Sequence, residues 1–296
     1  MRVFVTGATG FIGSALVPEL IQVGHQVLGL TRSEEGAEKL RAAGAEVLHG
    51  NIEDLDSLRR GAADSDGIVH LAFNHNFAEF QKNCQNDAIA IAAMGEVLVG
   101  SNRPFVVTSG TAIAANVDGL PSTEDSPTAA WNLRGASEAN VKSLADRGVR
   151  ACIVRLSQIH DTRKQGLVTR LTAVAREKQV SVYIGDGANR WPAAHVSDTA
   201  RLYRLALEKA EPGAIYHAVA EQGVPLKAIA ETLGRGLRVP VISMRSEEAE
   251  AHFGWSARFV AQDFPSSSVR TQQALGWKPT GPGLLADLDG MDYSQL

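Results

Sequence analysis

The chain has 296 residues, of which 44% are hydrophobic and 21% are charged, and its formal net charge is −4. This size and composition are typical of a soluble globular protein with one large α/β domain, or with one domain and a smaller lobe. The slightly acidic balance argues against nucleic acid as a partner, and no run approaches the ~18 apolar residues of a membrane span.

Two further features bound the class of protein. The apolar N-terminus lacks the charged region, apolar core and cleavage site of a secretory signal, so we expect none. Cys84 and Cys152 are the only cysteines, which is too few for a disulfide framework or a cysteine zinc site. We therefore expect a cytoplasmic protein.

The first half of the chain alternates predicted strands and predicted helices. The strands are expected at residues 2–6, 26–30, 46–49, 67–71, 104–108 and 151–155. The helices between them are expected at residues 11–23, 34–43, 55–63, 83–100 and 136–147. Such alternation predicts a parallel sheet that is covered by helices on both faces.

The alternation loosens after about residue 160. Helices are predicted at 166–178, 196–209 and 225–237, and a strand at 215–219, while "GDGANRWP" is interpreted as a glycine-rich loop. We predict a nucleotide-binding core over residues 1–160. Residues 161–296 are expected to form mainly a small C-terminal substrate-binding lobe, with segments that return to the core sheet.

A glycine turn joins the first predicted strand to the first predicted helix. "TGATGFIG" places Gly7, Gly10 and Gly13 in a G-x-x-G-x-x-G spacing. In this setting the first glycine allows a tight turn, the second admits a pyrophosphate and the third lets helix and strand pack closely. The helix N-terminus adds free N–H groups and a positive dipole end. The alternative is a structural turn without a ligand.

These features predict a doubly wound parallel sheet of the Rossmann type that binds a dinucleotide. The residues of the turn expected at the cofactor are Gly7, Thr9, Gly10, Phe11, Ile12 and Gly13. At the end of the second strand, where a carboxylate would hold a ribose 2′-hydroxyl, the chain has Arg32. An arginine can pair with a 2′-phosphate, so NADP (NADPH) is predicted as the cofactor, unless Arg32 is only a solvated surface charge.

The chain resembles the short-chain dehydrogenase/reductase superfamily, in its extended or atypical branch. The segments that carry this resemblance are "TGATGFIG", "GNIEDLDSL", "IVHLA", "VVTSGTA", "VRLSQIH", "NRWPAAHVSDTARLYRLAL" and "ALGWKP". The resemblance implies further cofactor contacts along the sheet edge, at Asn51, Ile52, Leu71, Ala72, Thr108, Ser109, Ser157 and Ile159. It also implies a homodimer.

The chain departs from this superfamily at the usual catalytic residues. A Tyr-x-x-x-Lys motif is expected at the start of the helix after the serine strand, but the chain has Arg134-Gly-Ala-Ser-Glu138. At the serine position it has Gly110, between Ser109 and Thr111. Since a guanidinium does not lose its proton, Arg134 cannot replace the tyrosine as a proton donor.

Arg134 is instead expected to hold an anionic substrate or to stabilise an oxyanion. Glu138 is expected to pair with Arg134 at i, i+4, and the alternative is that the two form an exposed ion pair without function. Thr111, Arg134 and His75 are the candidate catalytic residues. His75 follows the fourth strand and is in the pKa range for a general acid, although the favoured alternative is a loop histidine bonded to backbone.

Other residues are weaker candidates. His160, like His75, is either a general acid or a histidine bonded to backbone. Arg190 either lines the substrate cleft or lies in a surface turn. Trp191 is predicted to pack in the core. No histidine or cysteine spacing predicts a metal.

The sequence thus predicts an NADP-dependent oxidoreductase acting on a small organic carbonyl, alcohol or C=C compound. One alternative is a non-catalytic sensor of the NADP redox state, because the usual triad is missing. The other is an epimerase or isomerase with bound cofactor. It ranks lowest, since that chemistry relies on the same missing tyrosine.

Overall fold

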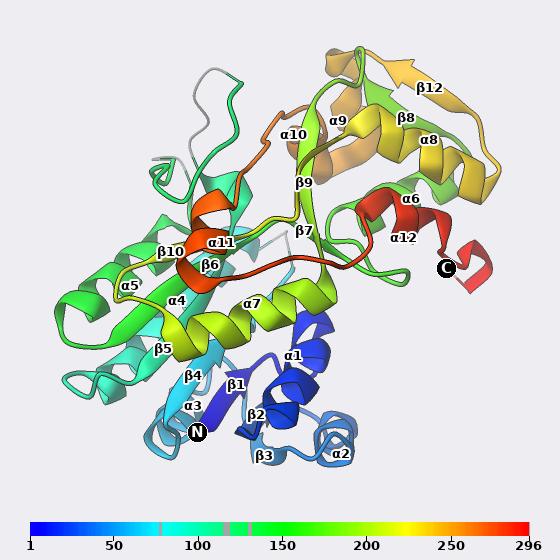
Figure 1. The fold of residues 1–296 in the computed structure, drawn as a ribbon. Coiled ribbons are helices and arrows are strands. Elements are labelled where there is room, and N and C mark those ends of the chain that lie inside the picture. Colours follow the sequence, from blue (N-terminus) through cyan, green and yellow to red (C-terminus); the bar gives the residue numbers. More distant parts are fainter. Residues whose placement is uncertain (77–78, 115–118, 130–131, 296) are drawn as a thin grey trace.

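A seven-stranded parallel sheet is the centre of the molecule (Figure 1). The computed structural model describes residues 1–76, 79–114, 119–129 and 132–295. The strands run in the order β10-β6-β5-β4-β1-β2-β3, and every pair is parallel. They are β1 (Arg2–Thr6), β2 (Gln26–Thr31), β3 (Glu46–His49), β4 (Gly67–His70), β5 (Pro104–Gly110), β6 (Arg150–Leu156) and β10 (Ile215–Ala218).

Helices cover both faces of this sheet because its strands are apolar on both sides. On one face α1 (Phe11–Gln22) and α7 (Val196–Lys209) bury leucines and valines against β1, β5 and β6, with α2 (Glu34–Ala42) beside them. On the other face lie α3 (Leu55–Ala63), α4 (Phe80–Leu98) and α5 (Gly135–Asp146), packed on Phe4, Ile68 and Phe105. The predicted doubly wound α/β fold is confirmed.

The strand order fixes where a ligand can bind. The chain runs outward from β1 to β3 on one side and from β4 to β6 on the other, so the order reverses between β1 and β4. In open α/β sheets the crevice at the carboxyl ends of the strands, at this reversal, is the ligand site. The loops after β1 and β4 therefore flank the expected site.

The C-terminal part forms a lobe around a third apolar cluster. It contains a three-stranded sheet, in the order β11-β9-β7, and a two-stranded sheet of β12 and β8. The strands are β7 (Gln158–His160), β8 (Ser181–Ile184), β9 (Arg190–His195), β11 (Glu221–Pro225) and β12 (Val241–Met244). The helices are α6 (Val168–Lys178), α8 (Leu226–Leu237), α9 (Ala249–Phe253), α10 (Ala257–Val260) and α12 (Leu284–Asp289).

Several segments after residue 160 belong to the central sheet rather than to the lobe. β10 pairs with β6 at the sheet edge, and α7 packs against α1. α11 (Val269–Leu275) follows and packs near β10 and α7 (Figure 1). The chain also contains the short 3₁₀ turns η2 (Thr111–Ile113), η3 (Ser246–Glu248), η4 (Gly254–Ser256) and η5 (Tyr293–Gln295).

The interpretation of "GDGANRWP" as a glycine-rich loop holds for residues 185–189, which form a turn between β8 and β9. It is wrong for the end of this segment, because β9 begins at Arg190. β9 is nearly continuously buried, so it lacks the alternation of apolar and polar residues that marks a half-exposed strand. Within the described residues, no helix is long and apolar enough to cross a membrane.

Candidate active site

The glycine turn brings the loops after β1 and β4 into contact. Gly7 has a φ of +67°, and a Cβ at this position would lie 2.8 Å from the backbone nitrogen of Ala72. A Cβ on Gly13 would lie 2.2 Å from the carbonyl oxygen of Gly7. Side chains are therefore excluded at both positions, and α1 begins directly after Gly10. The backbone of the turn, including Thr9, Phe11 and Ile12, is left open to a ligand.

The loops after β2 and β3 lie beside this turn, at the same edge of the sheet. Arg32 is exposed immediately after β2, and the Ser33 side chain caps α2 by accepting from the Gly36 N–H at 3.2 Å. The neighbouring carboxylate of Glu34 is engaged by Arg41 at 2.6 Å. After β3, the Asn51 side chain accepts from two backbone N–H groups of its own turn and so shapes the loop that contains Ile52.

A buried polar network connects β1, β4 and α4. Thr6 Oγ1 lies 2.7 Å from His70 Nδ1 and accepts from the Ala72 N–H at 3.3 Å. His70 Nε2 lies 3.2 Å from Asp87 Oδ1, and both side chains are 1% exposed. The Thr108 hydroxyl donates to the His70 carbonyl at 2.6 Å, so it is occupied within the core. This network fixes the loop of Leu71 and Ala72.

Arg134 lies at the N-terminal end of α5 and points back toward the sheet edge. Its guanidinium donates to the Thr108 carbonyl at 2.9 Å and lies 4.3 Å above the centroid of the Phe73 ring. One terminal nitrogen lies 3.4 Å from Asp87, while Nε has no hydrogen-bond partner among the described residues. The side chain is 14% exposed. Its charge is therefore only partly compensated.

Asp87 is the carboxylate behind Arg134. Burial alone would raise the pKa of Asp87, but hydrogen bonds from His70 and Ser137 and the charge of Arg134 hold this pKa below its ordinary value. The Ser137 hydroxyl is the nearest donor, at 2.6 Å. Asp87 is thus an anion whose contacts with His70 and Ser137 are shorter than its contact with Arg134.

The predicted pairing of Glu138 with Arg134 is wrong, and so is the alternative of an exposed pair. Arg134 precedes the first helical turn, and Glu138 faces the other way, into the protein. There it forms a bidentate pair with Arg155, with distances of 2.9 and 2.8 Å. Arg155 is 1% exposed and Glu138 7%. Both carboxylate oxygens of Glu138 are therefore occupied by Arg155, and neither contacts Arg134.

The other predicted residues lie along the same edge but differ in what they expose. Thr111 is buried and its hydroxyl donates to the Leu156 carbonyl at 3.3 Å, Ser109 is buried, and Ser157 donates to the Ala218 carbonyl. Ile159 is 4% exposed and packs in the core, which leaves only its backbone for a ligand.

His75 lies exposed after β4. The pKa of His75 is held below its usual value, chiefly by desolvation and then by the charges of Arg134 and Lys164. Its imidazole is therefore mainly neutral near pH 7.

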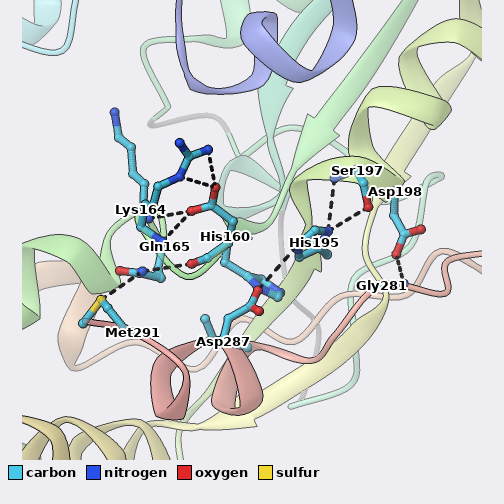
Figure 2. A network of polar contacts seen from close by, with 12 residues as sticks. His160, Lys164, Gln165, His195, Ser197, Asp198, Gly281, Asp287 and Met291 are labelled. Atoms are coloured by element: carbon cyan, nitrogen blue, oxygen red, sulfur yellow. Dashed lines mark hydrogen bonds and ion pairs between the residues drawn. The ribbon is translucent and has the colours of Figure 1, made fainter. Parts of the chain in front are cut away.

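His160 belongs to a polar network of the lobe, in which it contacts Asp287 (Figure 2). It is 0% exposed, and its Nδ1 lies 2.6 Å from the Asp287 carboxylate. Arg190 forms an ion pair with Asp263 at 2.8 Å. Trp191 is fully buried and stacks on Phe264. The idea that His160 acts as a general acid is wrong, because its ring is enclosed by the lobe.

Several residues of the site were missed by sequence reasoning. Arg155 is a single charge in an otherwise apolar strand, a pattern that signals a buried, paired charge, whereas Asp87 follows a polar stretch and gave no such signal. Phe73 gave no such signal, because a lone aromatic in a loop has no periodicity. Lys164, which lies 5.8 Å from the Phe11 ring centroid, follows β7 in a strongly charged turn.

The sequence of this chain is similar to a known family and to several known proteins. The sequence profile described as "Epimerase: NAD dependent epimerase/dehydratase family" matches residues 3–220. An uncharacterized protein of Schizosaccharomyces pombe is 50% identical over 295 residues, which is 99% of this chain and 100% of that protein. A 4-hydroxy-2-methyl-3-oxo-4-farnesyl-3,4-dihydroquinoline-1-oxide ketoreductase of Stigmatella aurantiaca is 27% identical over 271 residues, 86% of this chain and 80% of the ketoreductase.

The fold is also found in solved structures. A crystal structure of dTDP-glucose 4,6-dehydratase from Streptomyces venezuelae, with NAD bound, is similar with a TM-score of 0.78 and 21% identity. The similarity covers 98% of this chain and 95% of that one.

Proposed function

The chain belongs to the NAD dependent epimerase/dehydratase family, and from this premise we propose that it is an NADP-dependent oxidoreductase acting on a small carbonyl compound or the corresponding alcohol. The family match confirms the resemblance found in the sequence. The observation that carries the proposal is the partly compensated guanidinium of Arg134 at the carboxyl edge of the sheet. It stands where the resemblance places a catalytic tyrosine.

The residues present fit a dinucleotide. Gly7 and Gly13 have no room for a side chain, Gly10 ends the turn, and the first helical turn of α1 contains no acidic residue that would repel a phosphate. We assign the phosphate contacts to this turn, the adenosine to the loops of Arg32 and Asn51, and the nicotinamide end to the segment around Ser157. A bound nicotinamide cofactor would supply or accept a hydride at its C4 carbon.

Arg134 would stabilise the negative charge that develops on the substrate oxygen. A fixed cation in a low-dielectric site is effective there because it needs no rearrangement during the reaction. Arg134 is held in place by the Thr108 carbonyl, Phe73 and Asp87. It does not exchange a proton, since a guanidinium stays protonated.

The proton must therefore come from another group. His75 follows β4, the strand next to β1, and the charge of Arg134 contributes to lowering the pKa of His75, which supports a position within reach of Arg134. We assign it, directly or through a water, to proton exchange with the substrate oxygen. Thr111 is a weaker candidate, because its hydroxyl is buried and bonded to Leu156.

The choice of NADP rests on Arg32. It follows β2 without a carboxylate at the strand end, and the nearby Glu34 is neutralised by Arg41. Arg32→Ala is expected to lower the affinity ratio of NADPH to NADH by about tenfold, the loss of one charge-assisted contact. An unchanged ratio would show that the 2′-phosphate is not bound by Arg32.

A redox sensor without turnover is the second candidate, favoured by the absence of the tyrosine and lysine. The two functions separate in one assay. Purified protein is mixed with NADPH and a panel of small ketones, including 3-oxoalkanoates, and NADPH consumption is followed by absorbance. Consumption that depends on one class of ketone supports the reductase. Tight NADPH binding without consumption across the panel would support the sensor.

A further inference from the structure

One lysine of the lobe lies over the glycine turn, although it is remote from it in sequence. The Nζ atom of Lys164 lies 5.8 Å from the centroid of the Phe11 ring, and Phe11 is the first residue of α1. The charge of Lys164 also lowers the pKa of His75, which follows β4. Lys164 therefore lies near both loops that meet at Gly7 and Ala72.

The turn that carries Lys164 is built rigidly. The Asp161 side chain accepts from the N–H groups of Arg163 and Lys164 at 2.7 and 2.8 Å, and the Asp161 N–H donates to the Lys164 carbonyl at 2.9 Å. The next residue, Gln165, is 1% exposed and donates to the Asp161 carbonyl at 3.0 Å. Such Asx-type bonding fixes the backbone direction of a turn.

The turn is also anchored to the C-terminal part of the chain (Figure 2). His160, at its start, binds Asp287 of α12, and Gln165, at its end, contacts the Met291 sulfur at 3.2 Å. Figure 2 shows the Lys164 side chain extending away from these anchors. The backbone position of Lys164 is therefore set before any ligand binds, which lowers the entropy cost of using it.

The charge of Lys164 is not neutralised within the described residues. The neighbouring Arg163 pairs with the Asp161 carboxylate at 3.2 Å, whereas no ion pair joins Lys164 to a described carboxylate. Lys164 is exposed. An ammonium near the side chain of the first residue of α1 is unfavourable beside the positive end of the helix dipole unless an anion lies between them.

We infer that Lys164 binds the pyrophosphate of the dinucleotide from the lobe side, opposite the glycine turn. This inference rests on the proposed function, since it needs a dinucleotide on that turn. An ammonium is a compact point charge that binds phosphate without a fixed geometry. The lobe thereby takes part in holding the cofactor as well as the substrate.

The test is titration of the full-length protein with NADPH, without substrate, for wild type and three variants. Lys164→Gln removes the charge, Lys164→Arg keeps it, and Arg163→Gln removes a neighbouring charge from the same turn. We expect Lys164→Gln to raise the Kd for NADPH about tenfold, the loss of one charge-assisted contact. Lys164→Arg and Arg163→Gln should stay within roughly twofold of wild type. Adenosine 2′-monophosphate, which lacks the pyrophosphate, should bind all four proteins equally.

Three results would overturn the inference. Equal Kd values for Lys164→Gln and Arg163→Gln would show that the effect is not specific to Lys164. An unchanged Kd for NADPH with a raised KM for the carbonyl substrate would show that the lysine meets an anionic group of the substrate. Absence of NADPH and NADH binding by the wild type would overturn the proposed function together with this inference, whereas the first two results leave the proposed function standing.

Discussion

Two arginines near the carboxyl ends of β5 and β6 have opposite environments. Arg155 is 1% exposed and donates to both oxygens of Glu138, at 2.9 and 2.8 Å, and to the Ser126 carbonyl at 3.0 Å. Arg134 is 14% exposed, lies 3.4 Å from a carboxylate shared with two other groups, and has no partner for its Nε in the part of the chain that the structure describes. The first charge is fully paired and the second is only partly paired.

This contrast indicates which of the two arginines has a structural role and which is available to a ligand. A buried charge with every donor satisfied stabilises the fold and has nothing left for a ligand. A charge fixed by packing, but without a full set of partners, is held ready for an anion that forms during a reaction. Disturbing the two pairs should therefore affect different quantities, stability for one and activity for the other.

The largest effect is expected at the Arg155 pair. Glu138→Gln leaves Arg155 buried without a counter-charge, which should lower the free energy of unfolding by about 3–5 kcal/mol. The matched control is Glu96→Gln, since Glu96 forms a bidentate pair with Arg147 at the surface, with both side chains about half exposed. That variant should cost less than about 1 kcal/mol. Chemical denaturation of both variants measures the contrast.

The same pair predicts a dependence of stability on pH. Burial alone would raise the pKa of Glu138, but the hydrogen bonds and charge of Arg155 outweigh it and hold the pKa below the usual 4.5. The stabilisation is therefore complete above the unfolded-state pKa and is lost as pH falls through the lowered folded-state value. The stability gap between wild type and Glu138→Gln should narrow in this acidic range, and a constant gap would contradict the ion pair.

The next effect concerns Arg134 and activity. Arg134→Gln removes the charge that faces the substrate oxygen and should lower kcat by about 10²–10³-fold, the range measured for loss of one oxyanion donor. Stability should change little compared with Glu138→Gln. Ketone reduction and thermal unfolding, measured on the same preparation, separate the two. A variant with full activity would exclude Arg134 from the reaction.

Asp87 is expected to have a smaller effect, because it acts through Arg134. Asp87→Asn removes a negative charge but keeps a side chain of the same shape, whose single oxygen can still accept from either Ser137 or His70. We expect kcat to fall about tenfold, one lost charge-assisted contact, with KM little changed. In a double mutant with Arg134→Gln, the two losses should be clearly less than additive. Additive losses would mean that Asp87 acts independently of Arg134.

The smallest effect is a shift of pH dependence at His75. In alcohol oxidation the neutral imidazole accepts the proton, so the rate should fall with decreasing pH only below the usual histidine value of 6.5. Lys164→Gln removes one of the two charges that lower this pKa and should move the fall to a slightly higher pH. The pH profile of His75→Asn, which lacks the group, should show no such fall.

The sequence allowed some features to be predicted because they are local. The glycine turn, the strand–helix alternation and the missing tyrosine and lysine are patterns within a few residues, and the fold followed from them. The partners of Arg134 and Glu138 could not be predicted in this way, because Asp87 and Arg155 lie 47 and 17 residues away in the chain. The strand β9 was missed because burial on both faces removed the alternation on which the prediction relies.

Hydride transfer assisted by Arg134 is tested most directly by deuterium transfer. NADPH labelled at C4, separately on each face, is mixed with the ketones that wild type consumes. We expect label on the carbinol carbon of the product for wild type, from one face only. Arg134→Gln should bind NADPH with unchanged affinity and transfer label at a rate reduced about 10²–10³-fold. Tight NADPH binding by wild type with no labelled product would contradict the account and leave a sensor of the cofactor.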